Sequence, residues 1–169
     1  MPADPASRLL VRRADLHNPQ DAAAYRDQLN HYAADPMGSG RPLPQEILRQ
    51  VTADLAQLPH AHAFLAFVGR QPVGFATCFG GYSTFRARPL WNIHDIAVLA
   101  QWRGRGIGAA LIRHIADQAR AAGCCKLTLE VREDNPSAAA LYRREGFRAA
   151  AIGAREVQYL FLEKALDGD

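Results

Sequence analysis

A glycine-rich stretch at residues 101–108 has the composition of a binding loop for phosphate groups. It reads Gln-Trp-Arg-Gly-Arg-Gly-Ile-Gly and precedes a strongly helical pattern. Glycines allow several backbone N–H groups to point at one ligand, and the start of a helix adds about half a positive charge. Arg103 and Arg105 add full charges and paired donors. The stretch predicts a cradle for a diphosphate, and the alternative is a tight turn with solvated arginines.

The glycine spacing restricts the ligand only in part. A Walker A loop needs Lys followed by Ser or Thr after its last glycine, whereas Ala109 follows Gly108. Gly104, Gly106 and Ala109 match the relaxed dinucleotide fingerprint, and Glu130 lies about 20 residues further on. That fingerprint belongs to a βαβ unit that opens a domain, whereas roughly 100 residues precede it here. A nicotinamide dinucleotide therefore stays open as an alternative.

A second segment, residues 135–147, follows a predicted strand. It reads Asn-Pro-Ser-Ala-Ala-Ala-Leu-Tyr-Arg-Arg-Glu-Gly-Phe. Asn135 before Pro136 is typical of a helix N-cap with proline in the first helical position. Tyr142 follows two turns later, where it could simply be a core side chain packed beside Phe147.

Taken together, the two segments resemble the GCN5-related N-acetyltransferase (GNAT) superfamily. Arg103-x-x-Gly106-x-Gly108 and the Asn135-to-Tyr142 segment stand in the family's order, and the likeness covers about residues 63–147. The resemblance implies an α/β fold whose central, twisted, mostly antiparallel sheet is splayed at the cofactor site, with helices on both faces. It also implies an enzyme that transfers the acetyl group of acetyl-CoA to an amine by direct attack in a ternary complex.

The resemblance also assigns cofactor residues. In the family the turn binds the pyrophosphate of acetyl-CoA, the preceding strand pairs with the pantetheine arm, and an asparagine contacts pantetheine. The matching positions in this sequence are Ile96, Ala97, Val98, Arg103, Gly104, Arg105, Gly106, Ile107, Gly108, Ala109, Asn135, Ala138 and Tyr142.

Proton transfer is the remaining chemical requirement. By resemblance, Tyr142 stands where many members carry a general acid, and a phenol of pKa near 10 can protonate a departing thiolate whose thiol has a pKa of about 8.5.

Deprotonating an alkylammonium at pH 7 costs about 4.6 kcal/mol, so a general base is also expected. His94 and Asp95 lie in the strand where the family often places acidic groups. Neighbours in a strand point to opposite faces unless a bulge intervenes. We expect His94 to be the base and Asp95 to hold the strand from the other face.

The acceptor is the least defined part of the prediction. The segment 82–88, Tyr-Ser-Thr-Phe-Arg-Ala-Arg, resembles the diamine/polyamine N-acetyltransferase branch, but His94 replaces the first acid of that branch's acidic pair. We therefore expect a small-molecule primary amine, without a preference for polyamines. A peptide or protein amine, and a non-catalytic acyl-CoA-binding module, are the alternatives. Glu130 could also face the acceptor.

Hydrophobic periodicity and turn residues predict the elements that position these groups. Strands are expected at 8–13, 63–68, 73–79, 91–99, 127–131 and 157–161. Helices are expected from the Asn18 cap to Asp35, from Pro44 to Leu58, from Gly104 to Ala122 and from Asn135 to Glu145.

Composition limits the class of protein. The 169 residues, 49% of them hydrophobic, suit a single domain over 1–169, and the net charge of +3 is too small and scattered to argue for nucleic acid. The sequence offers neither a membrane-spanning stretch nor a secretory signal, and three cysteines suit free thiols, so we expect a cytoplasmic location. His60-x-His62 lacks a third ligand, so no metal site is expected. A homodimer is expected because dimers are common in the family.

Overall fold

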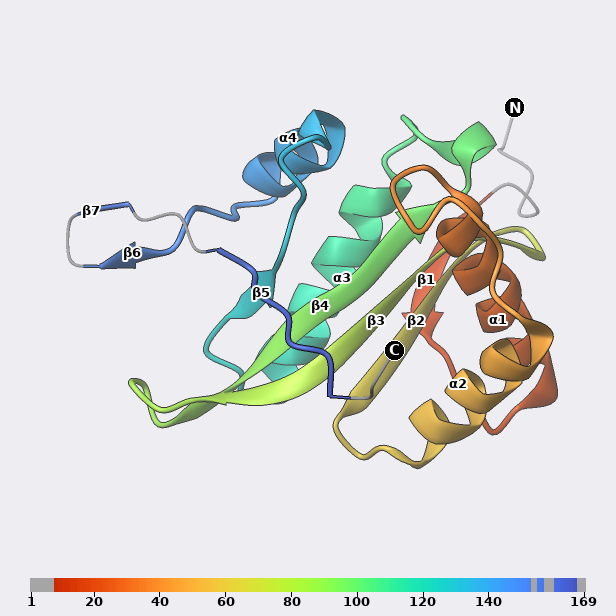
Figure 1. The fold of residues 1–169 in the computed structure, drawn as a ribbon, viewed down its shortest axis with the longest axis horizontal. Coiled ribbons are helices and arrows are strands. Elements are labelled where there is room, and N and C mark those ends of the chain that lie inside the picture. Colours follow the sequence, from red (N-terminus) through yellow and green to blue (C-terminus); the bar gives the residue numbers. More distant parts are fainter. Residues whose placement is uncertain (1–7, 153–154, 157–159, 167–169) are drawn as a thin grey trace.

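The computed structural model describes residues 8–152, 155–156 and 160–166. Its elements are β1 (Leu9–Arg13), α1 (Pro19–Ala34), α2 (Gln45–Gln57), β2 (Ala61–Val68), β3 (Gln71–Ser83), β4 (Arg88–Val98), a 3-10 turn (Ala100–Trp102), α3 (Ile107–Ala121), β5 (Leu127–Leu129), α4 (Pro136–Arg144), β6 (Ala151–Ile152) and β7 (Arg155–Glu156). Strands β1 to β5 form one sheet in chain order (Figure 1). All neighbours are antiparallel except the parallel pair β4–β5, which confirms the predicted mostly antiparallel sheet.

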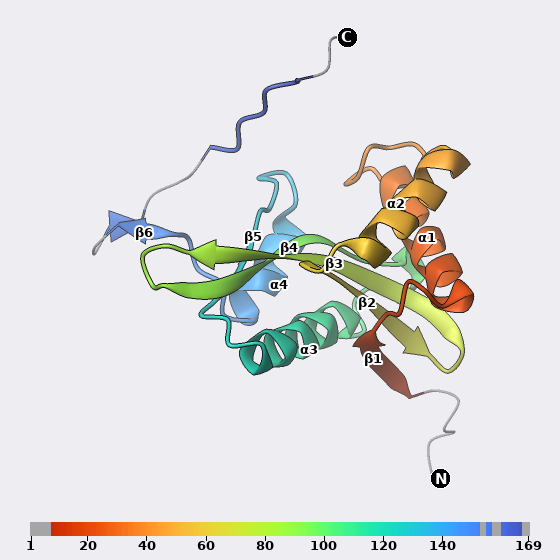
Figure 2. The same cartoon turned by 90° about the horizontal axis from the view of Figure 1, so that it is seen from below.

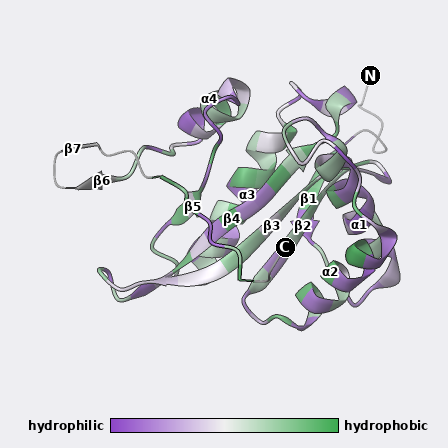
Figure 3. Cartoon of the chain, in the orientation of Figure 1, coloured by the Kyte–Doolittle hydropathy of each residue, from purple (hydrophilic) through white to green (hydrophobic). Residues whose placement is uncertain are grey.

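Helices cover both faces of this sheet (Figure 2). On one face α1 and α2 pack over a cluster that contains Tyr25, Leu65 and Phe75. On the other face α3 contributes Leu111 and Ile115 to a larger cluster. The apolar residues run through the central strands and α3 (Figure 3). Alternation along the strands therefore sends successive side chains into two separate cores.

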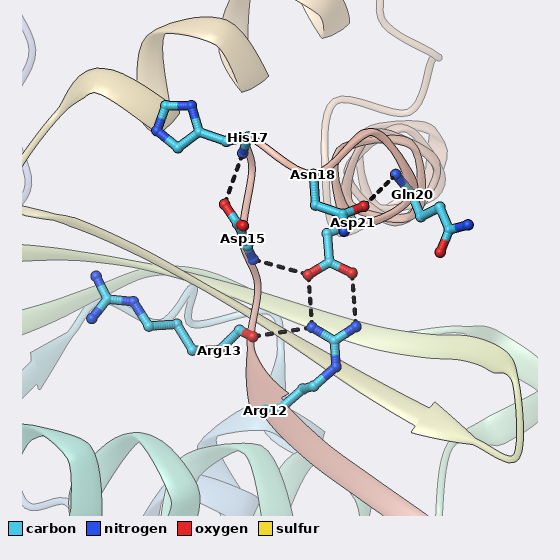
Figure 4. A network of polar contacts seen from close by, with 7 residues as sticks. All are labelled: Arg12, Arg13, Asp15, His17, Asn18, Gln20 and Asp21. Atoms are coloured by element: carbon cyan, nitrogen blue, oxygen red, sulfur yellow. Dashed lines mark hydrogen bonds and ion pairs between the residues drawn. The ribbon is translucent and has the colours of Figure 1, made fainter.

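A polar network fixes the point where α1 follows β1 (Figure 4). The guanidinium of Arg12 donates two hydrogen bonds of 2.7 Å to the carboxylate of Asp21, which also accepts from the backbone N–H of Asp15. These donors lower the pKa of Asp21, with the Arg12 hydrogen bond the largest cause. The predicted cap is confirmed, because Asn18 Oδ1 accepts from the N–H of Gln20 at 2.8 Å. The start of α1 is thereby tied to the sheet edge.

Several predicted boundaries differ in the structure. α3 begins at Ile107 rather than Gly104, because Gly104 and Gly106 have φ of 74° and 79°, outside the helical region. β5 ends at Leu129 and not at residue 131. β3 and β4 are longer than predicted at the hairpin, where Ser83 pairs with Arg88.

The end of the chain differs as well. Of the strand predicted at 157–161, residues 157–159 lie outside the described residues, and residues 160–161 are in neither helix nor strand. The segment 160–166 extends away from the sheet (Figure 2). It exposes four large apolar side chains, at 74–90% of their full surface: Leu160, Phe161, Leu162 and Leu166.

Candidate active site

The turn before α3 uses its glycines for two different reasons. Gly104 and Gly106 have positive φ, and a Cβ on either would meet nothing within 4 Å. Glycine is therefore needed at both positions for its backbone conformation, and the space beside the two residues is open to a ligand. Gly108 differs, because a Cβ there would lie 2.9 Å from Leu141 Cδ2 of α4. It permits the close approach of α4 to α3.

The first turn of α3 presents unpaired backbone donors. Gly106 is the N-cap and provides no side-chain cap, and the first helical bond runs from the N–H of Ala110 to the oxygen of Gly106 at 3.0 Å. The preceding N–H groups of residues 107–109 have no partner within the helix. They point out of the positive end of the helix dipole, next to the open space beside Gly106. A diphosphate fits this donor set.

The two arginines of the turn are held differently. Arg103 donates through Nε to the backbone oxygen of Val98 at 3.0 Å and through Nη2 to Asp35 Oδ2 at 2.6 Å. The guanidinium of Arg105 lies 4.7 Å from the centre of the Trp102 ring, in a cation–π contact. Both arginines are exposed, so their positive charges flank the turn.

One edge of β4 is partly free. β4 pairs with β5 only over Trp91 to Ile93, whereas on its other edge it pairs with β3 as far as Val98. Among the described residues, no strand pairs with residues 94–98 on the β5 side. Ile96, Ala97 and Val98 therefore offer backbone groups at an open sheet edge that leads to the glycine turn. An extended ligand can bind there as an added strand.

A β-bulge changes the predicted orientation of His94 and Asp95. Thr77 of β3 pairs with Asp95, but the next residue, Cys78, pairs with Ile93, so His94 is an extra residue in β4. The His94 ring lies 5.4 Å from the ring of Phe79, two residues along β3 from Thr77 and on the same face. The expectation that the two side chains point to opposite faces is wrong. Both lie on the face that α1 and α2 cover.

Asp95 is largely buried and linked to α1. Burial raises the pKa of Asp95, while the electrostatic influence of His94 and the hydroxyl of Thr77 act in the opposite direction. Thr77 Oγ1 is 2.5 Å from the hydroxyl of Tyr25, whose own pKa is raised by burial. A phenol that stays protonated acts as the donor, which leaves the Thr77 hydroxyl hydrogen free for the carboxylate. A carboxylate of raised pKa beside an imidazole suits proton exchange.

The helix α4 carries the two residues predicted from the second segment. Asn135 is the N-cap, and its Oδ1 accepts from the N–H of Ala138 at 3.1 Å. The Tyr142 ring packs edge-on against Phe147 at 5.9 Å. Its hydroxyl bonds to none of the described residues, and no buried side-chain polar atom among them lacks a partner. Burial of the ring, followed by the nearby Tyr32, raises the pKa of Tyr142.

A further carboxylate lies where β4 and β5 diverge. Asn92 Nδ2 donates to Thr128 Oγ1 at 3.1 Å and lies 3.4 Å from both carboxylate oxygens of Glu130. Asn92 pairs with Phe79, whose ring contacts His94, so this group adjoins the bulge. The region can attract a cationic amine.

Sequence reasoning missed the residues that α1 contributes. Burial, followed by the charge of the nearby Asp95, raises the pKa of Tyr32. With Asp35, Tyr32 lines a cavity of about 110 Å³ whose other wall includes Val98 and Arg103. No spacing in the sequence marked these residues, because about 60 positions separate α1 from β4.

Neither a metal-ligand cluster nor a bilayer-spanning helix occurs in the described part of the chain. The described residues contain no group of three or more His, Cys, Asp or Glu side chains that could hold a metal ion. None of the helices in this part of the chain has the length and hydropathy needed to cross a bilayer.

Comparisons with known proteins identify relatives. The model of the "Acetyltransferase (GNAT) family" matches residues 26–147. The chain is 36% identical over 99 residues to N-alpha-acetyltransferase RimI of Mycobacterium tuberculosis, covering 57% of this chain and 58% of that protein. It is 36% identical over 85 residues to thialysine N-epsilon-acetyltransferase of Bos taurus, covering 50% and 45%. The chain thus spans about half the length of these curated relatives.

The fold has many counterparts among solved structures. The aminoglycoside N-acetyltransferase AAC(6')-Iy in complex with CoA superposes with a TM-score of 0.75 at 18% identity, over 97% of this chain and 98% of that one. At this level of identity the likeness concerns the fold.

Proposed function

The chain belongs to the GNAT acetyltransferase family, and on that premise we propose that it transfers the acetyl group of acetyl-CoA to a primary amine of a small molecule. The transfer is a direct attack of the amine on the thioester in a ternary complex. The family match favours acetyl-CoA over a nicotinamide dinucleotide as the ligand of the glycine turn.

One observation carries this proposal: β4 serves both halves of the reaction. Its open edge at residues 96–98 leads to the glycine turn, while the bulge directs His94 and Asp95 to the face beneath α1. Backbone groups of β4 would hold the pantetheine arm, and the N–H groups at the start of α3 would hold the diphosphate. The oxygen of Asn135 serves as the cap, whereas its amide N–H₂ bonds to none of the described residues and could donate to the same ligand. A thioester held along β4 would therefore lie beside the proposed base.

The charge around the bulge supports an amine acceptor. The Asp95 side chain lies on the same face of the sheet as His94, and the Glu130 carboxylate adjoins the bulge. Tyr32 adds a hydroxyl from α1. Carboxylates attract the ammonium form of an amine, and His94 would then accept its proton. The resemblance of residues 82–88 to the diamine/polyamine branch is consistent with this charge.

The second candidate function is acetylation of a protein or peptide amine, and the similarity to RimI favours it. The two functions share the cofactor site and differ in the acceptor.

Free-thiol release from acetyl-CoA, measured against a panel of amines, tests the proposal. The panel contains diamines, amino acids, an aminoglycoside and peptides with free N-termini. We expect turnover with at least one small primary amine, and turnover with peptides alone would favour the second candidate. Binding of CoA without turnover on any amine would instead indicate a non-catalytic acyl-CoA-binding module.

Substitution of Gly106 by glutamate tests the diphosphate cradle. Gly106 has a φ of 79°, and a glutamate there would bring strain, a side chain and a negative charge into the open space beside the turn. We expect the affinity for acetyl-CoA to fall by more than about tenfold, measured by calorimetry, with the fold retained by circular dichroism. Gly123→Glu, at a positive-φ position after α3, is the matched control. Unchanged binding by Gly106→Glu would contradict the assignment.

We also expect a homodimer, because the segment 160–166 exposes Leu160, Phe161, Leu162 and Leu166 to solvent in a single chain. A second copy of the chain would cover these side chains. Substituting Phe161 and Leu162 by serine should halve the mass measured by light scattering, whereas Ile47→Ser on α2 should not. A monomeric wild-type protein would exclude the dimer.

The three cysteines are free thiols, which supports the cytoplasm as the expected compartment. Neither nucleic acid nor a membrane is proposed as a partner.

A further inference from the structure

The last turn of α1 and the glycine turn are joined by one ion pair. Arg103 opens the glycine turn, and Asp35 caps the C-terminal end of α1, where its N–H donates to the oxygens of His31 and Tyr32. The Arg103–Asp35 distance of 2.6 Å bridges two segments that are 68 residues apart in sequence. In Figure 1 the loop after α1 lies beside the segment that follows β4.

Asp35 also organises the loop between α1 and α2. Its Oδ1 accepts from the N–H of Met37 at 2.8 Å, and its backbone oxygen accepts from Gly38 and Gly40 at 2.8 and 3.2 Å. Both carboxylate oxygens are therefore in use, one by the loop and one by Arg103. The Asp35 side chain is only 16% exposed, against 53% for Arg103.

The space between the two segments is only partly filled at this point. A cavity of about 110 Å³ separates the last turn of α1, with Tyr32 and Asp35, from the end of β4 at Val98. Arg103 lies on the wall of this cavity, and its Nε bond to the Val98 oxygen anchors the guanidinium on β4. The ion pair therefore provides a direct polar connection across this cavity.

The guanidinium retains donors for a ligand. Arg103 has five N–H donors, and the bonds to Val98 and Asp35 use one on Nε and one on Nη2. The two on Nη1 bond to none of the described residues. An anion at the glycine turn can thus contact Arg103 without displacing Asp35.

We propose that Asp35 is a positioning residue: through Arg103 it transmits occupation of the glycine turn to the last turn of α1, which carries Tyr32 on the acceptor side. This inference rests on the proposed function, because the anion at the turn is the diphosphate of the acetyl donor. Since the Arg103 hydrogen bond lowers the pKa of Asp35, the carboxylate is charged at neutral pH. Binding at the turn should therefore order the α1–α2 loop before an amine arrives.

Amide hydrogen exchange with CoA as the probe tests this coupling without an acceptor. Four amides report on the loop, since Gly38 and Gly40 donate to the Asp35 oxygen and Ser39 and Arg41 donate to the Ala33 oxygen. In the wild type, saturating CoA should slow their exchange about fivefold or more, as expected for coupled sites. Exchange in the first turn of α3 should slow as well, because CoA binds there directly.

Asp35→Asn is the informative variant. Its single amide oxygen can keep the Met37 bond but cannot also accept from Arg103, so the loop should stay folded while the connection is lost. We expect CoA still to protect the start of α3 and no longer to protect the 38–41 amides. Asp117→Asn, which removes the carboxylate of the exposed Asp117–Arg120 pair in α3, is the matched control and should respond as the wild type does. The melting temperature of Asp35→Asn should fall by about 4 °C or less, because the Arg103 side of the pair is exposed to solvent, and such ion pairs stabilise little.

The outcomes distinguish a failure of the Asp35 coupling from a failure of the proposed acetyl-CoA site. Loop protection by CoA in Asp35→Asn equal to that in the wild type would overturn the inference. Protection of α3 without any loop response in the wild type would overturn it as well, while leaving the proposed function intact. If CoA protected neither segment of the wild type, the proposed function would fail first, and the inference with it.

Discussion

Replacing Tyr142 with phenylalanine is expected to lower turnover by about 10²–10⁴ and to leave acetyl-CoA binding nearly unchanged. The ring packs on Phe147, and phenylalanine keeps that contact. The hydroxyl bonds to none of the described residues, so we expect its loss to cost little stability. What the variant loses is the proton for the departing thiolate.

The raised pKa of Tyr142 has two opposing consequences. It keeps the phenol protonated throughout the neutral range, as an acid must be, and burial of the ring is its main cause. The same upward shift makes proton transfer harder. Transfer from a phenol to a thiolate is uphill by about 2 kcal/mol even at ordinary pKa values, so the proton must move as the C–S bond breaks. We therefore expect no alkaline loss of Tyr142-dependent activity below about pH 10.

Steady-state kinetics and calorimetry on Tyr142→Phe measure these effects. Tyr82→Phe, which removes a hydroxyl from an exposed residue of the β3–β4 hairpin, is the matched control and should retain full turnover. A loss smaller than about threefold for Tyr142→Phe would assign Tyr142 to packing alone, since general acid catalysis is worth far more.

His94→Ala is expected to reduce turnover about 10²-fold and to abolish the acidic limb of its pH profile. A base must be deprotonated to act, so activity should rise with pH through the base's pKa. Direct transfer from an amine of pKa near 10.4 remains uphill by about 5 kcal/mol, so a lowered amine pKa or a water relay must assist.

Asp95 is now expected to assist His94 rather than to hold the strand from the opposite face. The bulge places both side chains on one face, and a carboxylate beside the imidazolium that forms on proton transfer would stabilise that cation. Asp95→Asn should therefore lower activity. If His94→Ala kept the limb and most activity while Asp95→Asn lost both without unfolding, Asp95 would be the base.

The stability of Asp95→Asn provides an independent check. Burial raises the folded-state pKa of Asp95 above its unfolded value. The protonated group is therefore favoured in the fold, and that contribution is lost as pH rises through the folded pKa. Asparagine mimics the protonated form, so the variant should be at least as stable as the wild type at pH 8. Its advantage should shrink at low pH, as thermal melts at several pH values would show.

Most of the local structure could be read from the sequence. Periodicity located the helices α1, α2, α3 and α4, and the caps at Asn18 and Asn135 are confirmed by bonds to backbone N–H groups three or fewer residues away. The glycine turn was also recognisable, because positive φ is a property of the residue itself. The family resemblance rested on these same short segments.

The tertiary structure alone decided which side chains meet. Whether His94 is bulged depends on its register with Thr77 and Cys78 on another strand, and a one-residue shift reverses the face without changing the local sequence pattern. The Arg103–Asp35 bridge depends in the same way on how α1 packs over the end of β4. Local propensity acts over a few residues, whereas these contacts join segments tens of residues apart. Only the packed sheet and helices bring them together.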